Sequence, residues 1–254
     1  MAIKVALLGA GRMGRAAAKK IVEAGDIEIV AAYDLKPGGP VEGVKVQDIK
    51  ELDGGLDGVD VAVDFTLPSA CCENAKTISD AGVKLVVGTT GFDEGQMKKL
   101  KDMVEPVGAV ISPNMSVGVN VFWQLVGEAA EKFKGYDIEV VEAHHRFKKD
   151  APSGTALKAV ERICEASGRD VRGDVVYGRE GECPRREGEI GVHSIRAGDI
   201  VGEHTVIFST LGERFEIRHQ AHSRESFASG IPDAIRFIKA RKGVYDMQDV
   251  LGLR

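Results

Sequence analysis

The sequence predicts an α/β protein that combines a Rossmann-like, doubly wound parallel sheet with a second, α+β domain built on an open mixed sheet. Three observations support this prediction. In the N-terminal part of the chain, short apolar runs alternate with helical patterns, as in a parallel sheet covered on both faces. A glycine-rich turn directly follows the first apolar run. Later runs alternate polar and apolar residues, which is typical of a sheet with one covered and one open face.

The first domain is expected to alternate five strands with helices. The expected strands are residues 3–8, 27–33, 59–65, 83–87 and 109–111. The expected helices are residues 15–24, 68–81 and 94–103. Residues 41–58 are poorly patterned, and we expect only a short strand or helix and a turn there. Continuous apolar runs of this kind indicate strands that are buried on both faces.

The second domain is expected to begin with a long helix over residues 117–133. Four of its apolar residues share one face: Val121, Leu125, Ala129 and Phe133. The expected strands that follow are residues 136–141, 174–177, 191–196, 203–208 and 213–219. Further helices are expected at 155–167 and 227–239, and Pro232 either begins or kinks the second of these.

The glycine-rich turn is Gly9-Ala10-Gly11-Arg12-Met13-Gly14. An expected strand precedes it and an expected helix follows it, which makes the G-x-G-x-x-G pattern a credible dinucleotide site. The three glycines would in turn permit a tight bend, a close approach of backbone to a pyrophosphate, and close packing of helix on strand. The helix N-terminus would stabilise the phosphates.

Asp34 ends the second expected strand, about twenty residues after the glycines, where a carboxylate binds the hydroxyls of the adenosine ribose. An acid at this position favours NADH, because it repels a 2′-phosphate. Lys36 and Arg12 could neutralise that phosphate, so the cofactor is predicted as NADH or NADPH. The alternative reading of Asp34 is an ordinary turn acid.

Gly88, Thr89 and Thr90 follow the expected strand 83–87. Ligands of an open α/β sheet bind at the carboxyl ends of its strands, so these residues are expected along the nicotinamide ribose. A plain strand-to-helix turn would explain the glycine without the paired threonines.

A basic loop lies between the expected strand 136–141 and the helix that follows. His144, His145 and Lys148 lie in it, and Pro152-Ser153-Gly154-Thr155 reads as a helix start with Ser153 as N-cap. The free N–H groups of Gly154 and Thr155 would bind an anion, and His144 and Lys148 are residues that handle protons. The alternative is a pair of structural histidines beside a solvated basic loop.

The stretch from Glu142 to Ala156, with Glu-Ala-His-His, a following Lys and Asp-Ala-Pro-Ser-Gly-Thr-Ala, resembles the signature of the 4-hydroxy-tetrahydrodipicolinate (dihydrodipicolinate) reductases. The resemblance implies NAD(P)H-dependent reduction of a cyclic imine dicarboxylate, with loss of water, in lysine and diaminopimelate biosynthesis. It implies His144 as the acid–base residue and Lys148 as the proton donor. His145, Gly154 and Thr155 would bind the substrate carboxylates. The residues alone do not divide the proton between His144 and Lys148.

Two other stretches resemble the same family. Gly88-Thr89-Thr90-Gly91 occurs there as a cofactor contact, and Ser112-Pro113-Asn114-Met115 resembles a stretch that runs beside the nicotinamide ring. Ser112 and Met115 replace Ala and Phe of that pattern, and Asn114 could bind the carboxamide. The resemblance also implies a homotetramer formed through the second domain. It implies a C-terminal tail that returns to the nucleotide domain, so we expect residues 1–116 with 225–254 around 117–224.

Composition favours an ordinary globular enzyme: 43% of the 254 residues are hydrophobic, and the net charge is −5. This charge argues against general nucleic-acid or membrane-surface binding, and no apolar run is long enough to span a bilayer. The chain enters a strand at once with no signal peptide, so we expect a cytoplasmic location. The four cysteines match neither a redox pair nor a zinc site, and we expect no metal. Two rival functions are another two-domain nicotinamide dehydrogenase and a non-catalytic NAD(H) sensor.

Overall fold

A computed structural model describes residues 2–254, so Met1, the first residue of the expected nucleotide domain, lies outside the described residues. The chain divides into two compact units. The first unit comprises the residues up to Val117 together with Arg224–Arg254, and the second comprises Gly118–Ser223. Helices flank a parallel sheet in the first unit and a mixed sheet in the second, which confirms the predicted fold class.

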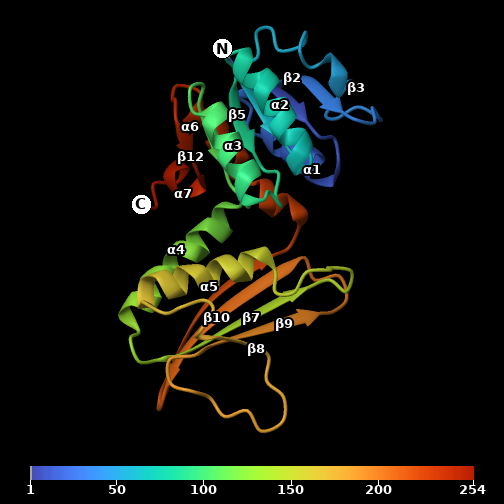
Figure 1. Cartoon of the computed structure of the whole chain (residues 1–254). Coiled ribbons are helices and arrows are strands. Elements are labelled where there is room, and N and C mark those ends of the chain that lie inside the picture. The colour runs from blue at the N-terminus through green and yellow to red at the C-terminus, as the bar shows by residue number, and fades with distance from the viewer. Residues whose placement is uncertain (1) are drawn as a thin grey trace. The chain divides into compact units, whose positions relative to one another are not determined.

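The first unit is built on a seven-stranded parallel sheet in the order β12-β6-β5-β4-β1-β2-β3 (Figure 1). Its strands are β1 (Ile3–Leu8), β2 (Ile27–Asp34), β3 (Val46–Asp48), β4 (Val61–Asp64), β5 (Lys84–Val87), β6 (Ala109–Ile111) and β12 (Val244–Tyr245). The chain leaves β1 toward β2 and β3, then returns to the other side of β1 with β4. The strand order therefore reverses beside β1, which is where a doubly wound sheet binds its ligand.

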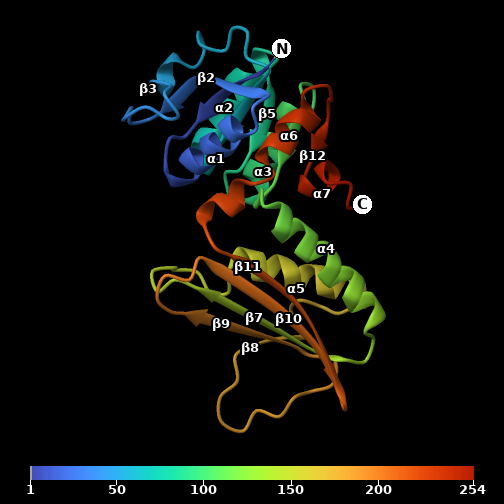
Figure 2. The same ribbon diagram turned by 180° about the vertical axis from the view of Figure 1, so that it is seen from behind.

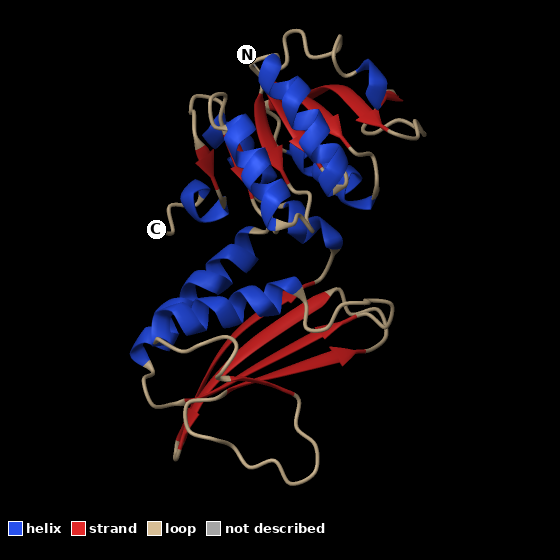
Figure 3. Ribbon diagram, in the orientation of Figure 1, coloured by secondary structure: helices blue, strands red, loops and turns tan. Residues whose placement is uncertain are grey.

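Helices cover both faces of this sheet (Figure 3). The helices of one face are α1 (Arg12–Glu23) and α6 (Ile231–Ile238), and those of the other are α2 (Pro68–Asp80) and α3 (Glu94–Val104). Shorter elements are η1 (Ile49–Glu51), η2 (Arg224–Ala228) and α7 (Met247–Val250). The C-terminal residues return to this unit because β12 pairs in parallel with β6.

The second unit is an open, five-stranded mixed sheet in the order β11-β10-β7-β9-β8 (Figure 2). Its elements are α4 (Val117–Lys132), β7 (Asp137–His144), α5 (Gly154–Ser167), β8 (Val175–Tyr177), β9 (Ile190–Arg196), β10 (Gly202–Thr210) and β11 (Glu213–Ala221). Strand β9 runs parallel to β7 and β8, whereas β10 runs antiparallel to β7 and β11. Helices α4 and α5 pack on the same face of the sheet, where they enclose the core of this unit.

The four apolar residues expected on one face of the long helix differ in burial. Ala129 and Phe133 pack against the core of the second unit, whereas Leu125 is 46% exposed. The residues that α4 buries are Val119, Phe122, Trp123, Val126 and Ala130. Apolar residues lie on more than one side of this helix, so its periodicity does not select a face. The Trp123 ring lies in the core and donates a hydrogen bond to the Thr155 carbonyl oxygen of α5.

Two element boundaries also differ from the expectation. Helix α6 begins at Ile231 with Pro232 in its first turn, so the proline begins the helix and does not kink it. Strand β7 continues past Val141 to His144. His144 is therefore the last residue of a strand, held by the sheet, and not part of the loop that follows.

Candidate active site

The glycine turn between β1 and α1 has the shape that a dinucleotide requires. Gly9 has φ 88°, and a Cβ on Gly14 would lie 1.8 Å from the Gly9 carbonyl oxygen, so neither position accepts a side chain. A Cβ on Gly11 would meet nothing within 4 Å. No side chain caps the N-terminus of α1. The turn therefore leaves both space and N–H groups for a pyrophosphate.

Asp34, at the end of β2, also holds this turn in place. Its Oδ2 accepts a hydrogen bond from the Ala10 N–H at 2.7 Å, and its Oδ1 accepts one from the Lys36 N–H at 3.0 Å. The Asp34 carboxylate thus connects the end of β2 to the glycine turn through a hydrogen bond. The two cations that could accept a 2′-phosphate, Arg12 and Lys36, are both exposed.

A hollow of about 460 Å³ lies at the carboxyl ends of β5 and β6, and Thr89, Thr90, Ser112 and Pro113 contribute to its lining. Of the two threonines, Thr89 is buried and Thr90 is exposed. Met115 is only 1% exposed, because its side chain packs in the core with α6. A contact of Met115 with a cofactor would have to come from its backbone.

Asp64 is a site residue that the sequence did not reveal. This fully buried carboxylate ends β4 and accepts four hydrogen bonds, from the Thr66 N–H and hydroxyl, the Asn74 amide and the Thr89 hydroxyl, at 2.7 to 2.9 Å. It joins the ends of β4 and β5 to helix α2. The available signal was an acid at the end of an otherwise apolar strand, beside the Gly88-Thr89-Thr90 turn.

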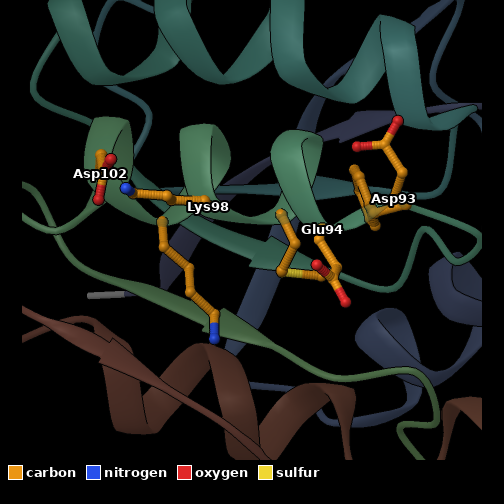
Figure 4. Close-up of a pocket in the computed structure, with 7 residues that line it drawn as sticks. Asp93, Glu94, Lys98 and Asp102 are labelled. Carbon is orange, nitrogen blue, oxygen red and sulfur yellow. The ribbon is translucent and has the colours of Figure 1, made fainter.

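A second hollow of the first unit, about 520 Å³ in volume, lies over α3 (Figure 4). It contains none of the predicted site residues. Its labelled charged side chains are spread along the helix, with Asp93 and Asp102 at opposite ends, and they do not converge on one point. We assign no role to this hollow.

In the second unit, the sheet gathers four polar residues on the face that α5 covers. Glu142 and His144 are two residues apart on β7, so the pleat points both to the same face. Arg196 on β9 is the register partner of His144, and His204 on β10 is the register partner of Glu142. Residues that are distant in sequence are thereby placed side by side.

Glu142 is the centre of this group. It is fully buried, and its Oε2 lies 2.5 Å from His144 Nδ1. Arg196 donates to both oxygens, at 2.8 and 2.9 Å, and the Ser153 N–H donates to Oε1 at 3.2 Å. Burial raises the pKa of Glu142, but the hydrogen bonds from His144, Arg196 and Ser194 outweigh it and lower that pKa to about 2. Glu142 is therefore an ionised carboxylate inside the protein.

The start of α5 lies beside this group. Ser153 is the N-cap, as predicted, and its hydroxyl oxygen accepts a hydrogen bond from the Ala156 N–H at 3.2 Å. The same hydroxyl lies 3.1 Å from Nε2 of His204, whose ring centroid is 5.2 Å from that of His144. The α5 N-terminus and His144 are thus both neighbours of the His204 imidazole.

Lys148 belongs to the same neighbourhood. Its Nζ lies 2.9 Å from Oδ2 of Asp150, and its side chain is 22% exposed. Burial is the main cause that lowers the pKa of His204, to about 3, and the charges of His144 and Lys148 lower it further. His204 is accordingly neutral. His145 is half-buried, and within residues 2–254 its Nδ1 has no hydrogen-bond partner.

This arrangement can bind an anion and move a proton. An imidazole, an ammonium group and a helix N-terminus surround one region of the second unit, and the first unit carries a turn shaped for a dinucleotide. Over residues 2–254 the structure contains no cluster of His, Cys, Asp and Glu suited to a metal, and no helix that is long and apolar enough to cross a membrane.

Comparison with known proteins gives consistent matches along the chain. The family described as dihydrodipicolinate reductase, N-terminus, matches residues 3–115, and the one described as dihydrodipicolinate reductase, C-terminus, matches residues 118–251. A 4-hydroxy-tetrahydrodipicolinate reductase of Methanothermobacter thermautotrophicus is 49% identical, with 99% of each chain covered. The reductase of Nitrosomonas europaea is 44% identical, again with 99% of each chain covered.

A solved structure agrees with these relatives. A dipicolinate-bound dihydrodipicolinate reductase from Paenisporosarcina sp. TG-14 superposes with a TM-score of 0.79 at 28% identity, covering 97% of this chain and 98% of that one. The bound dipicolinate is an aromatic ring with two carboxylates.

Proposed function

The chain belongs to the dihydrodipicolinate reductase family, and we propose that its His144 and Lys148 supply the acid–base chemistry by which it reduces 4-hydroxy-tetrahydrodipicolinate to tetrahydrodipicolinate. The enzyme is an NAD(P)H-dependent oxidoreductase of lysine and diaminopimelate biosynthesis. Hydride comes from the nicotinamide cofactor, and one water is lost. The first unit binds the cofactor and the second binds the substrate.

One observation carries the assignment of the substrate site. A single buried carboxylate, Glu142, accepts hydrogen bonds from both the His144 ring and the Ser153 N–H at the start of α5. It therefore holds a proton-carrying imidazole at a constant distance from a helix N-terminus. An anionic substrate bound at that N-terminus would have its reacting ring beside His144.

The substrate carries two carboxylates, and the site offers two kinds of group to bind them. The amides of Gly154 and Thr155 would bind one carboxylate, and His145 would bind the other. His144 and Lys148 then lie within the same region for proton transfer. Division of the proton between these two residues is left to experiment.

On the cofactor side, the glycine turn would bind the pyrophosphate and Asp34 the adenosine ribose. Gly88, Thr90 and the backbone of residues 112–115 would line the nicotinamide half. The cofactor is NADH or NADPH, since an acid and two exposed cations lie at the ribose position. Initial rates with the two cofactors side by side give the preference.

We also propose a homotetramer that assembles through the open face of the second sheet. This face carries apolar residues among its polar ones: Ile195 is 46% exposed, and Val141 and Ile207 are half-buried. A face of this composition suits contact with further copies of the chain. Sedimentation of the full chain gives the number of copies. The cytoplasmic location stays a prediction.

The test of function is oxidation of NADH or NADPH when 4-hydroxy-tetrahydrodipicolinate is added. His144→Gln and Lys148→Met should each lower kcat by about a hundredfold, the contribution of one positioned acid or base. Matched controls are Lys149→Met, an exposed neighbour on the same loop, and His222→Gln, an exposed histidine just after the end of β11. Both controls should keep the wild-type rate.

The outcomes separate the proposal from its rivals. A sensor would bind the cofactor and consume none, and a different dehydrogenase would oxidise it only with another substrate. Near-normal turnover in both His144→Gln and Lys148→Met would remove these two residues from the mechanism even if the reaction itself proceeds.

A further inference from the structure

The hydrogen bonds of Glu142 leave this carboxylate no free acceptor position. A carboxylate accepts about four hydrogen bonds. Glu142 accepts at least four: Oε1 from the Ser153 N–H and one Arg196 nitrogen, and Oε2 from the other Arg196 nitrogen and His144, with a further hydrogen bond from the Ser194 side chain. The Arg196 fork is itself fixed, because it also donates to the backbone carbonyls of Ile195 and Asp150. The carboxylate therefore has one orientation.

That orientation determines which nitrogen of His144 carries a proton. Because Glu142 is ionised and can only accept, the nitrogen that faces it, Nδ1, must be the donor. In the neutral ring, Nε2 then has a free electron pair. In the imidazolium, Nε2 carries the proton that can leave. When the Nε2 proton leaves, its electron pair stays on Nε2. The Nδ1 proton stays on Nδ1 and keeps its hydrogen bond to Glu142.

Arg196 changes the net charge beside the hydrogen-bonded pair of Glu142 and His144. A buried carboxylate alone would stabilise the imidazolium strongly and hold its proton. The bidentate guanidinium of Arg196 balances the negative charge of Glu142. The His144 ring therefore lies beside an ion pair whose net charge is close to zero.

We propose that Glu142, oriented by Arg196, is a positioning residue that fixes His144 in its Nδ1–H form and so directs Nε2 toward the reacting substrate. The inference rests on the proposed acid–base role of His144. The other charged and titratable groups around the ring are His204 on β10 and Lys148 with Asp150 on the loop. His219, on β11, lies behind His204.

Glu142→Gln gives a specific test, because its consequence can be derived from the donors. The Oε1 position faces two groups that can only donate, the Ser153 N–H and one Arg196 nitrogen, whereas the Oε2 position faces one such nitrogen and the His144 ring, so the amide oxygen should turn to the Oε1 side. The amide NH2 then faces His144 Nδ1 and donates to it. The neutral ring should therefore switch to its Nε2–H form.

The switch can be observed without any activity, in long-range proton–nitrogen NMR spectra of the full chain labelled at its six histidines. His144 is assigned by comparison with His144→Gln. The wild type should show Nδ1–H and Glu142→Gln should show Nε2–H. The kcat of Glu142→Gln should fall by about a hundredfold, and dipicolinate binding should stay within a few-fold of wild type.

Two further variants keep the test decisive. Glu161→Gln is the matched control, because Glu161 is an exposed carboxylate on α5 that pairs with Lys158 at 2.9 Å, so it should leave His144 and kcat unchanged. Arg196→Gln keeps the Glu142 acceptor and removes the balancing charge. Its His144 should stay in the Nδ1–H form, whereas the Glu142→Gln ring should switch to the Nε2–H form.

These outcomes distinguish failure of the inference from failure of the proposed function. An Nδ1–H ring in Glu142→Gln, or a switched ring with a wild-type rate and pH profile, overturns the positioning role. If the wild type does not oxidise NAD(P)H with the substrate, the function fails. A tautomer unaffected by Arg196→Gln but switched by Glu142→Gln still supports the structural part of the inference.

Discussion

His204 is the base through which mild acid should destabilise the second unit. Its ring is 1% exposed, and burial, together with the charge of His144, lowers its pKa from the ordinary value of 6.5 to about 3. In the unfolded chain, His204 would therefore bind a proton below pH 6.5. In the folded chain it binds that proton only near pH 3. The stabilisation is complete above the unfolded value and is lost as the pH falls.

The two pKa values give the size of the effect. At pH 5 the unfolded histidine is almost fully protonated and the folded one is not. Proton linkage then lowers the free energy of unfolding by about 2 kcal/mol relative to neutral pH. This is a large part of the stability of a typical domain. Complete loss, near the folded pKa, would amount to between 4 and 5 kcal/mol, or about 1.4 kcal/mol for each unit of pKa difference.

The assay uses the single tryptophan of the chain, Trp123, which is buried in the second unit and therefore reports on that unit. Urea unfolding followed by its fluorescence, at neutral pH and at pH 5 and at constant protein concentration, gives the two free energies. His204→Gln removes the titrating group and leaves an amide near the Ser153 hydroxyl. The advantage of wild type over this variant should shrink by about 2 kcal/mol on acidification.

The control is His222→Gln, since His222 is exposed and should leave the pH dependence unchanged. Burial also lowers the pKa of His219, but His219 is present in all three proteins and cancels in the comparison. Equal pH dependence of wild type and His204→Gln would refute the reasoning.

The remaining predictions concern the first unit. Asp64→Asn replaces an acceptor of four hydrogen bonds by an amide that has two N–H donors. In initial-rate measurements, the KM for NAD(P)H should therefore rise about tenfold while the KM for substrate stays constant. An unchanged cofactor KM would show that Asp64 does not support the cofactor site. Gly14→Ala should lower the melting temperature and abolish cofactor binding, because its Cβ would lie 1.8 Å from a carbonyl oxygen. Gly11→Ala, whose Cβ would meet open space, should keep the wild-type melting temperature and weaken only cofactor binding. Equal melting temperatures of Gly14→Ala and Gly11→Ala would contradict this prediction.

The parallel sheet was predictable because a strand buried on both faces is a continuous apolar run. Residues 3–8 and 109–111 were expected as strands and are β1 and β6 with those bounds. Strand β12 has two residues and no such run, and it becomes a strand only by pairing with β6. Its position was implied by family resemblance and not by its own residues.

The candidate substrate site was predictable where its parts are close in the chain. The strand, the loop and the Ser153 cap all follow from local patterns between residues 136 and 156. The partners from other strands were not predictable: Arg196 and His204 reach Glu142 only through the register of β9 and β10, which sequence periodicity does not specify.

The two units use the same physical solution to position a ligand loop. In each, a fully buried carboxylate near the end of a strand, Asp64 or Glu142, accepts at least four hydrogen bonds from groups distributed over neighbouring elements. Burying such a group is unfavourable unless every acceptor position is filled. A rearrangement of either loop would leave part of a buried charge unpaired, at a cost of about 1–3 kcal/mol for each lost hydrogen bond. The carboxylate therefore makes one loop conformation much more stable than its alternatives, before any ligand binds. This explains how the Gly88-Thr89-Thr90 turn and the loop between His144 and Thr155 can present their groups with constant geometry. It also explains why neutral amides should affect cofactor binding at Asp64 and catalysis at Glu142.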